Sequence, residues 1–217
     1  ENRTARYIIN DMLNTFVNYN LLVDQFDYDT NGAIQAVWIE SGVGNNPTTD
    51  SATPYEEDHW GSFASSASGT ATWTATVTTQ DVNEFTGVIS GTPTEGVLGF
   101  WIKHTDYTKI TNYTIRTGSD SSNYIEITKT PAQLSIASNN PIYIEISLIG
   151  FSVTGTPNWS AMDYSLIQFV CTASTTVEFA GMRFLQNKHF KHYPYVKDGL
   201  TFNAFRINYL KPMSIIQ

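Results

Sequence analysis

The most restrictive feature of this sequence is the alternation over residues 70–78, where every second residue is threonine. The residues between the threonines are alanine, tryptophan, alanine and valine. Successive side chains of a β-strand point to opposite faces, so this period of two predicts a strand with one apolar and one polar face. The sheet that contains it is therefore expected to be buried on one side and wet on the other.

Further short runs of β type follow one another along the chain, separated by turn sequences such as Gly91-Thr-Pro-Thr-Glu-Gly96. No helical pattern lies between them, and this spacing predicts an all-β fold, an antiparallel jelly-roll β-sandwich. Residues 43–58 are expected to form a long acidic loop. The predicted strands cover residues 21–26, 33–40, 70–79, 87–90, 97–104, 111–118, 123–129, 142–148, 164–172 and 176–185.

Both ends of the chain differ from this body. Residues 6–19 carry apolar side chains at three- and four-residue steps, which predicts an N-terminal amphipathic helix whose stripe packs on another subunit rather than on the sandwich. Near the C-terminus, Asp198-Gly199 stands between two β-like runs and predicts an appended hairpin. We divide the chain into an attachment helix (1–20), the sandwich (21–185) and a basic aromatic extension (186–217). The predicted interface residues are Ile8, Ile9, Met12, Leu13, Phe16, Val17, Phe190, Tyr193 and Arg206.

Charge is distributed unevenly in a chain whose net charge is −8. Residues 7–102 contain twelve Asp and Glu and no Lys or Arg, whereas residues 183–217 contain six basic residues and one acidic residue. The negative net charge argues against a nucleic acid or an anionic membrane as the partner. In addition, no apolar run has the ~18 residues of a membrane span. The basic tail is either a compositional accident or a docking segment for an acidic surface.

Catalytic motifs are missing from the sequence. It has no glycine-rich phosphate loop, no nucleophile elbow and no metalloprotease helix, and the single cysteine, Cys171, has no neighbouring histidine to activate it. Glu56, Glu57 and Asp58 stand beside His59, and paired carboxyls can hydrolyse glycosides. Adjacent residues of one loop point apart, however, so we predict a protein that is not an enzyme.

One segment has the spacing of a metal loop. Asp27, Asp29 and Asn31 place oxygen ligands at alternate positions ahead of Gly32, as in the front half of a calcium loop. The acidic residue that would close the loop is replaced by Trp38. We therefore predict no cofactor, with a structural calcium ion at Asp27, Asp29 and Asn31 as the alternative to an Asx-rich turn.

The five tryptophans are the remaining candidates for ligand binding. Trp38, Trp73 and Trp101 lie in apolar patterns and are predicted to be core residues. Trp60 and Trp159 lie in polar contexts, so they are the candidates for an exposed platform on which the apolar face of a sugar ring stacks. Alternatively, each of the two fixes its loop to the body of the domain.

Three stretches resemble a known family. Residues 22–38 resemble the opening strand and turn of galactose-binding-like jelly rolls of the carbohydrate-binding-module type. Residues 100–124 resemble the central strands of that family, and residues 154–185 its last loop and strand. The element Gly118-Ser-Asp-Ser-Ser-Asn-Tyr124 is similar to domains within bacteriophage virion structural proteins. Family members commonly hold calcium through an acidic pair where this chain has Ala180-Gly181.

The resemblance implies a non-enzymatic structural subunit of a phage virion, in the capsid or the tail. Its expected partners are other virion proteins, copies of itself and a cell-surface glycan, and its expected location is the virion. The alternative is a carbohydrate-binding module from a bacterial polysaccharide-degrading enzyme. Self-association favours the first function and a monomer favours the second.

Overall fold

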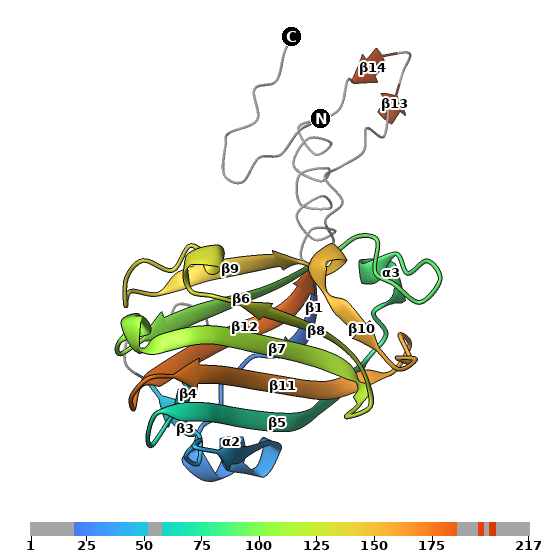
Figure 1. Cartoon of the computed structure of the whole chain (residues 1–217). Helices are drawn as coiled ribbons and strands as arrows, with labels where there is room; N and C mark the ends of the chain where they lie inside the picture. Colours follow the sequence, from blue (N-terminus) through green and yellow to red (C-terminus); the bar gives the residue numbers. More distant parts are fainter. Residues whose placement is uncertain (1–19, 52–57, 186–194, 198–199, 203–217) are drawn as a thin grey trace. The chain divides into compact units, whose positions relative to one another are not determined.

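A computed structural model describes residues 20–51, 58–185, 195–197 and 200–202. The chain divides into two compact units, Glu1–Gln186 and Asn187–Gln217. In the first unit, two antiparallel sheets stack face to face, so the predicted jelly-roll sandwich is confirmed (Figure 1). None of the helices in the described part of the chain has the length and apolar character of a membrane span.

Each sheet of the sandwich contains six strands. Sheet A has the order β3-β4-β12-β6-β9, and β1 also pairs with β12. Sheet B has the order β10-β8-β7-β11-β5-β2. In sheet A the strands are β1 (Asn20–Asp24), β3 (Thr48–Asp50), β4 (Trp60–Ala64), β6 (Val97–His104), β9 (Ile142–Ser147) and β12 (Thr176–Leu185). In sheet B they are β2 (Trp38–Gly42), β5 (Gly69–Gln80), β7 (Ile110–Asp120), β8 (Asn123–Lys129), β10 (Ser152–Thr154) and β11 (Met162–Cys171).

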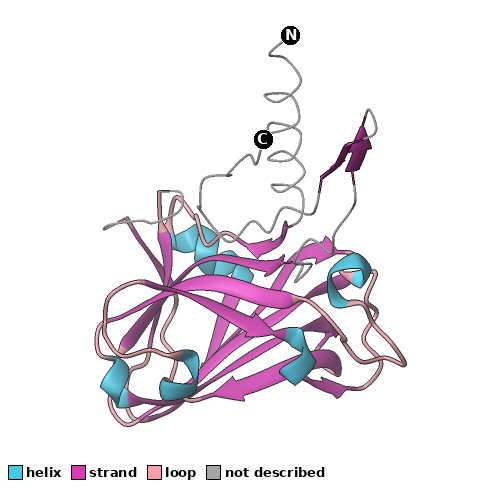
Figure 2. Ribbon diagram, turned by 90° about the horizontal axis from the view of Figure 1, so that it is seen from above, coloured by secondary structure: helices cyan, strands magenta, loops and turns pink. Residues whose placement is uncertain are grey.

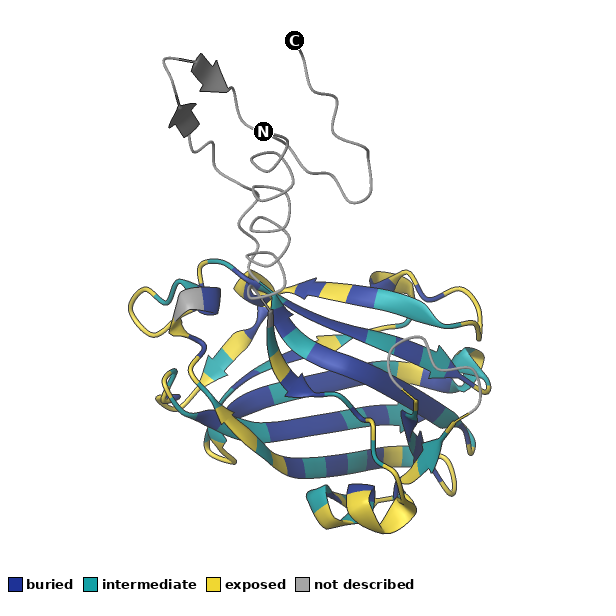
Figure 3. Ribbon diagram, turned by 180° about the vertical axis from the view of Figure 1, so that it is seen from behind, coloured by how far each residue is buried: buried dark blue, intermediate teal, exposed yellow. Residues whose placement is uncertain are grey.

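Large aromatic side chains fill the space between the sheets. Phe63 contacts Phe26, Trp38, Trp73 and Phe179, with ring centroids 5.3–5.8 Å apart. Aromatic side chains bury the largest apolar areas, so this cluster supplies much of the burial that holds the sheets together. Figure 3 shows buried residues along the central strands and exposed residues mainly at the loops and edges.

The alternation in residues 70–78 behaves as predicted. Ala71, Trp73 and Ala75 are buried in β5, whereas the threonines between them are not. Predicted strands 97–104, 123–129 and 176–185 coincide with β6, β8 and β12. Cys171 is buried and free, as predicted.

Several local predictions are wrong. Residues 33–40 were expected to form one strand, but α2 (Asn31–Val37) precedes β2 because Thr30 caps the helix by accepting a hydrogen bond from the Ala33 N–H. Residues 87–90 form no strand: the segment follows the short helix α3 (Asn83–Thr86), and an isolated bridge joins Ile89 to Thr92. Strands β3, β4 and β10 were not predicted.

Within the described ranges, three 3-10 turns connect strands: η1 (Tyr107–Lys109), η2 (Ala132–Leu134) and η3 (Leu148–Gly150). Together with the two α-helices they lie around the rim of the sheets (Figure 2).

The two termini are described only in part. Strands β13 (Tyr195–Lys197) and β14 (Leu200–Phe202) pair antiparallel, with Lys197 opposite Leu200, as expected of a hairpin around Asp198-Gly199. The predicted helix at 6–19 lies outside the described residues, and so do all nine predicted interface residues. Their role in attachment stays a prediction.

Candidate functional site

The outer face of sheet A carries aromatic side chains that the core does not use. A Cβ atom on Gly61 would meet Phe26 at 2.7 Å and Phe63 at 3.1 Å, so position 61 of β4 faces the core. Neighbouring residues of a strand point to opposite sides, and Trp60 therefore lies on the outer face. In agreement, Trp60 is absent from the cluster of core residues between the sheets.

The strand register aligns Trp60 with two further rings. Phe179 of β12 pairs with Gly61 of β4, so the next residue, Ala180, is level with Trp60. Ala180 pairs with Trp101 of β6, and Trp101 pairs with Tyr143 of β9. These residues form one row across β4, β12, β6 and β9, about 14 Å long at the usual strand spacing. We call Trp60, Ala180, Trp101 and Tyr143 the aromatic row.

The rings of Trp101 and Tyr143 are in contact. Their centroids lie 5.3 Å apart and their planes are tilted by 59°. Both side chains are half-buried. A Cβ atom on Gly99 would collide with the Tyr143 hydroxyl and would lie 2.8 Å from Leu185, so the absence of a side chain at Gly99 makes room for the tyrosine. Position 180 likewise carries only a small side chain, an alanine, at the centre of the row.

A charged cluster borders the aromatic row on one side. Lys103 Nζ lies 2.6 Å from Glu178 Oε2 and 3.9 Å from Asp50 Oδ2. Burial raises the pKa of the Glu178 carboxyl, the Lys103 ammonium lowers it and the nearby Asp50 carboxylate raises it. The net direction is upward, because removal from water disfavours the charged form of a carboxyl more than one lysine restores it.

Charged residues also border the row on its other side. Arg183 and Glu145 both pair with Gly99 and so lie on the same outer face. Arg183 donates a hydrogen bond from Nε to the carbonyl of Gly181 at 3.0 Å. The aromatic row is therefore flanked by donors and acceptors on both sides. Flat apolar rings beside such groups suit a ligand that combines an apolar face with hydroxyl groups, as a pyranose does.

The two predicted ligand-binding tryptophans occupy different places. Trp60 is fully buried, so the prediction that it is an exposed platform is wrong: it begins a strand, and its ring is covered. Trp159 is half-buried and packs against the core, and its carbonyl accepts a hydrogen bond from Val82. It lies in the loop before β11, at the other end of the sandwich from β4 (Figure 1).

The structure points instead to two residues that the sequence did not single out as ligand-binding. Trp101 was predicted to be a core residue, which is wrong, because β6 alternates and its inward positions are Leu98, Phe100 and Ile102. Tyr143 was not considered. The polar–apolar alternation of β9, in which Tyr143, Glu145 and Ser147 alternate with isoleucines, was the available signal.

The predicted calcium ligands have other contacts. Asp27 Oδ1 lies 3.0 Å from His59 Nδ1 and accepts a hydrogen bond from the Asp58 N–H, and Asn31 Oδ1 accepts one from the Thr49 N–H. Asp29 is exposed. Within the described ranges, no three His, Cys, Asp or Glu residues are grouped as metal ligands. These contacts do not fit a calcium loop, and the ion stays a prediction.

The carboxylates considered for glycoside hydrolysis are described in part. Glu56 and Glu57 lie outside the described residues. Asp58 is exposed and donates its backbone N–H to Asp27, and His59 faces the same carboxylate. His59 and Asp58 thus fix the start of β4 to the turn after β1.

Comparison with known proteins establishes the fold. No protein-family model matches the sequence, and no curated protein is recognisably similar to it. The family 30 carbohydrate-binding module of a cellulosomal cellulase of Clostridium thermocellum superposes with a TM-score of 0.56 at 13% identity, covering 77% of this chain and 99% of that one. A family 11 module of a cellulosomal cellulase of the same organism gives 0.53 at 11% identity, covering 80% and 98%.

A further family 11 module, in complex with a β-1,3-1,4-mixed-linked tetrasaccharide, gives a TM-score of 0.51 at 11% identity, covering 76% of this chain and 95% of that one. At these identities the likeness concerns the fold. The chain thus has the jelly-roll sandwich of carbohydrate-binding modules, as the resemblance implied, whereas nothing in these comparisons indicates a phage origin.

Proposed function

We propose that the sandwich binds a chain of neutral sugars across the outer face of sheet A. The observation that carries this proposal is the register that sets Trp101 beside Tyr143 within the aromatic row. In this function the two rings stack on the apolar faces of sugar rings, and the bordering side chains exchange hydrogen bonds with hydroxyl groups. The fold shared with carbohydrate-binding modules supports the same function.

The charges of this face favour a neutral ligand. Lys103 and Arg183 provide two positive charges, and Asp50, Glu145 and Glu178 provide three negative ones. An anionic polysaccharide would meet more repulsion than attraction here. Trp60 and Ala180 are fully buried, so the half-buried rings of Trp101 and Tyr143 provide the stacking surface of the row.

The test is affinity electrophoresis in native gels that contain one soluble polysaccharide each. Mixed-linkage β-glucan is the first choice, because a related fold binds a fragment of it; xyloglucan, glucomannan and xylan complete the panel. Trp101→Ala and Tyr143→Ala should each lower the affinity for the polysaccharide, as measured by the retardation, roughly tenfold or more, since each removes a stacking surface. No retardation by any polysaccharide, or equal retardation of the variants, would reject the proposal.

Two control variants separate binding from stability. Tyr164→Ala removes a half-buried tyrosine from the outer face of sheet B and should leave retardation unchanged. Trp159→Ala should lower the free energy of unfolding, because the ring packs against the core, and should not change affinity. Loss of binding with Trp159→Ala and retention with Trp101→Ala would move the site to the loop before β11.

We propose further that this face is not catalytic. Glu178 is ion-paired with Lys103 at 2.6 Å and Asp50 faces the same lysine, so both carboxylates are engaged by one cation. Incubation with each polysaccharide of the panel should release no new reducing ends. Release that disappears in Glu178→Gln would contradict this assignment.

The structural role in a virion is a separate proposal, which rests on the sequence resemblance. Its carriers are the predicted interface residues, which lie outside the described ranges: Ile8, Ile9, Met12, Leu13, Phe16, Val17, Phe190, Tyr193 and Arg206. Light scattering on the full chain and on a chain without residues 1–19 tests it. Self-association that depends on residues 1–19 supports attachment through the N-terminus, whereas a monomeric full chain favours a carbohydrate-binding module.

A further inference from the structure

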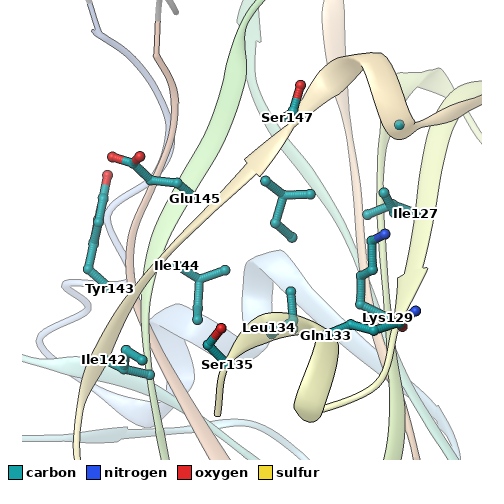
Figure 4. A pocket seen from close by; sticks show the side chains of 12 residues that line it. Ile127, Lys129, Gln133, Leu134, Ser135, Ile142, Tyr143, Ile144, Glu145 and Ser147 are labelled. Atoms are coloured by element: carbon teal, nitrogen blue, oxygen red, sulfur yellow. The ribbon is translucent and has the colours of Figure 1, made fainter.

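A cavity opens at the edge of the sandwich, between β8 of sheet B and β9 of sheet A. Its volume is about 430 Å³. It exists because β10 pairs with β8 only as far as Glu126, so the rest of β8 has no neighbouring strand on that side among the described strands. Turn η2 closes the bottom of the gap and Gly150 lines its margin (Figure 4).

The floor of this cavity is apolar. Ile127 of β8, Leu134 of η2, and Ile144 and Ile146 of β9 line it, and each is less than 9% exposed. They belong to the core cluster, so the cavity gives access to the margin of the hydrophobic core. An apolar group placed here would cover surface that the sandwich leaves open to water.

One positive charge stands at this cavity. Ile125 and Ile127 are buried on the inner face of β8, so the alternation of the strand points Lys129 inward as well. Lys129 is half-buried, and among the described residues no carboxylate lies within ion-pair distance of its ammonium. Glu145 and Tyr143 also belong to the lining of the cavity, but their side chains leave β9 on the other side from Lys129 (Figure 4).

Polar groups beside the lysine complete the margin. Ser135 lines the cavity, whereas the Ser147 side chain leaves β9 on the same face as Tyr143 and Glu145. Gln133 also lines it, and its side-chain carbonyl accepts a hydrogen bond from the Thr130 N–H. The cavity thus combines an apolar floor with a cationic, hydrogen-bonding margin, the composition of a small-molecule site.

We propose that this cavity binds a small carboxylic acid with an apolar tail, in a site separate from the aromatic row. The carboxylate pairs with the Lys129 ammonium, and the tail lies on Ile127, Leu134, Ile144 and Ile146. A charge-assisted hydrogen bond at a desolvated margin is stronger than a neutral one, and this selects an acid over an alcohol of the same length. Strand β9 serves both sites, with Tyr143 on one face and Ile144 on the other.

The alternative for Lys129 is a purely covering role, in which its methylene stem shields the core margin and its ammonium stays in water. The two roles differ in their dependence on ligand charge. A covering lysine gives no preference among an acid, an alcohol and an amine of equal length.

The experiment is isothermal titration of the full chain with octanoate, 1-octanol and octylamine, each below its aggregation concentration. Octanoate should bind saturably with a dissociation constant of about 1 mM or lower, and the alcohol and the amine roughly tenfold more weakly or not at all. Equal binding of acid and alcohol, or no saturable binding of the acid, would overturn the proposal.

Three variants locate the site. Lys129→Gln should weaken octanoate binding roughly tenfold and leave the weak binding of octanol unchanged. Gly150→Leu should abolish binding of both, because a Cβ atom there makes an ordinary 3.4 Å contact with Ile127 and the larger side chain fills the cavity. Lys109→Gln, at an exposed lysine next to Asp106, should bind as the native chain does. Thermal melting confirms that each variant is folded, and unchanged octanoate affinity in folded Lys129→Gln would refute the site.

Discussion

The buried histidine of β6 predicts how stability depends on pH. His104 is 4% exposed, and its Nε2 lies 2.5 Å from the hydroxyl of Tyr113, which is also buried. Its Nδ1 is buried without a hydrogen-bond partner among the described residues. Burial lowers the pKa of His104 to about 4, because the imidazolium cation would lose its hydration inside the sandwich.

The lowered pKa can be converted into a free energy. Between its ordinary value of 6.5 and about 4, the unfolded chain binds a proton at this histidine and the folded chain does not. The stabilising contribution is therefore complete above pH 6.5 and is lost as the pH falls toward 4. At about 1.4 kcal/mol for each pKa unit, the loss amounts to about 3 kcal/mol.

The assay is urea unfolding of the native chain and of His104→Gln at several pH values from about 7.5 to about 4. The glutamine does not titrate, so the free-energy difference between the two proteins should shrink by about 3 kcal/mol across this range. Asp24 and Glu178 have pKa values raised by burial and act in the opposite direction, but both proteins contain them and the comparison cancels their effect. A difference that stays constant with pH would refute this account of His104.

Three further substitutions test other parts of the structure. Gly99→Ala should displace the Tyr143 ring and weaken glycan retardation while the chain stays folded; unchanged retardation would show that this glycine is not needed. Asp24→Ala should lower the free energy of unfolding by about 3 kcal/mol in urea unfolding, because it leaves the buried donors of a tyrosine and a tryptophan without their acceptor. Lys103→Met should lower the free energy of unfolding by about 3 kcal/mol, because it leaves Glu178 buried and unpaired. The double variant Lys103→Met with Glu178→Leu should recover most of that loss. Strictly additive effects of the two substitutions would contradict the pairing.

Strands with a clear period of two were predictable from the sequence. In β8 one face is buried and the flanking turns are polar, so both of its boundaries agree with the prediction. Strand β4 was missed because Gly61 replaces a large inward residue: Phe26 of another segment fills that space, and no local pattern records it. The helix at Asn31–Val37 was missed because its signal is the single cap of Thr30.

The candidate site was harder to predict than the fold. In Val97–His104 both faces of the strand carry large apolar residues, so the sequence could not assign Trp101 to the outer side. The aromatic row also joins strands that are far apart in the chain, and their neighbourhood follows from long-range pairing in sheet A. The polar surroundings of Trp60 and Trp159 indicated exposure, but tertiary packing covers the first completely and the second in part.

Sugar binding on sheet A is tested most directly by NMR, by following the side-chain N–H signals of the five tryptophans while a mixed-linkage β-glucan oligosaccharide is added. The Trp101 signal should shift most, whereas the signals of the core residues Trp38 and Trp73 and of Trp159 should stay in place. A response confined to Trp159, or saturable binding without any shift of Trp101, would contradict a sugar-binding face on sheet A.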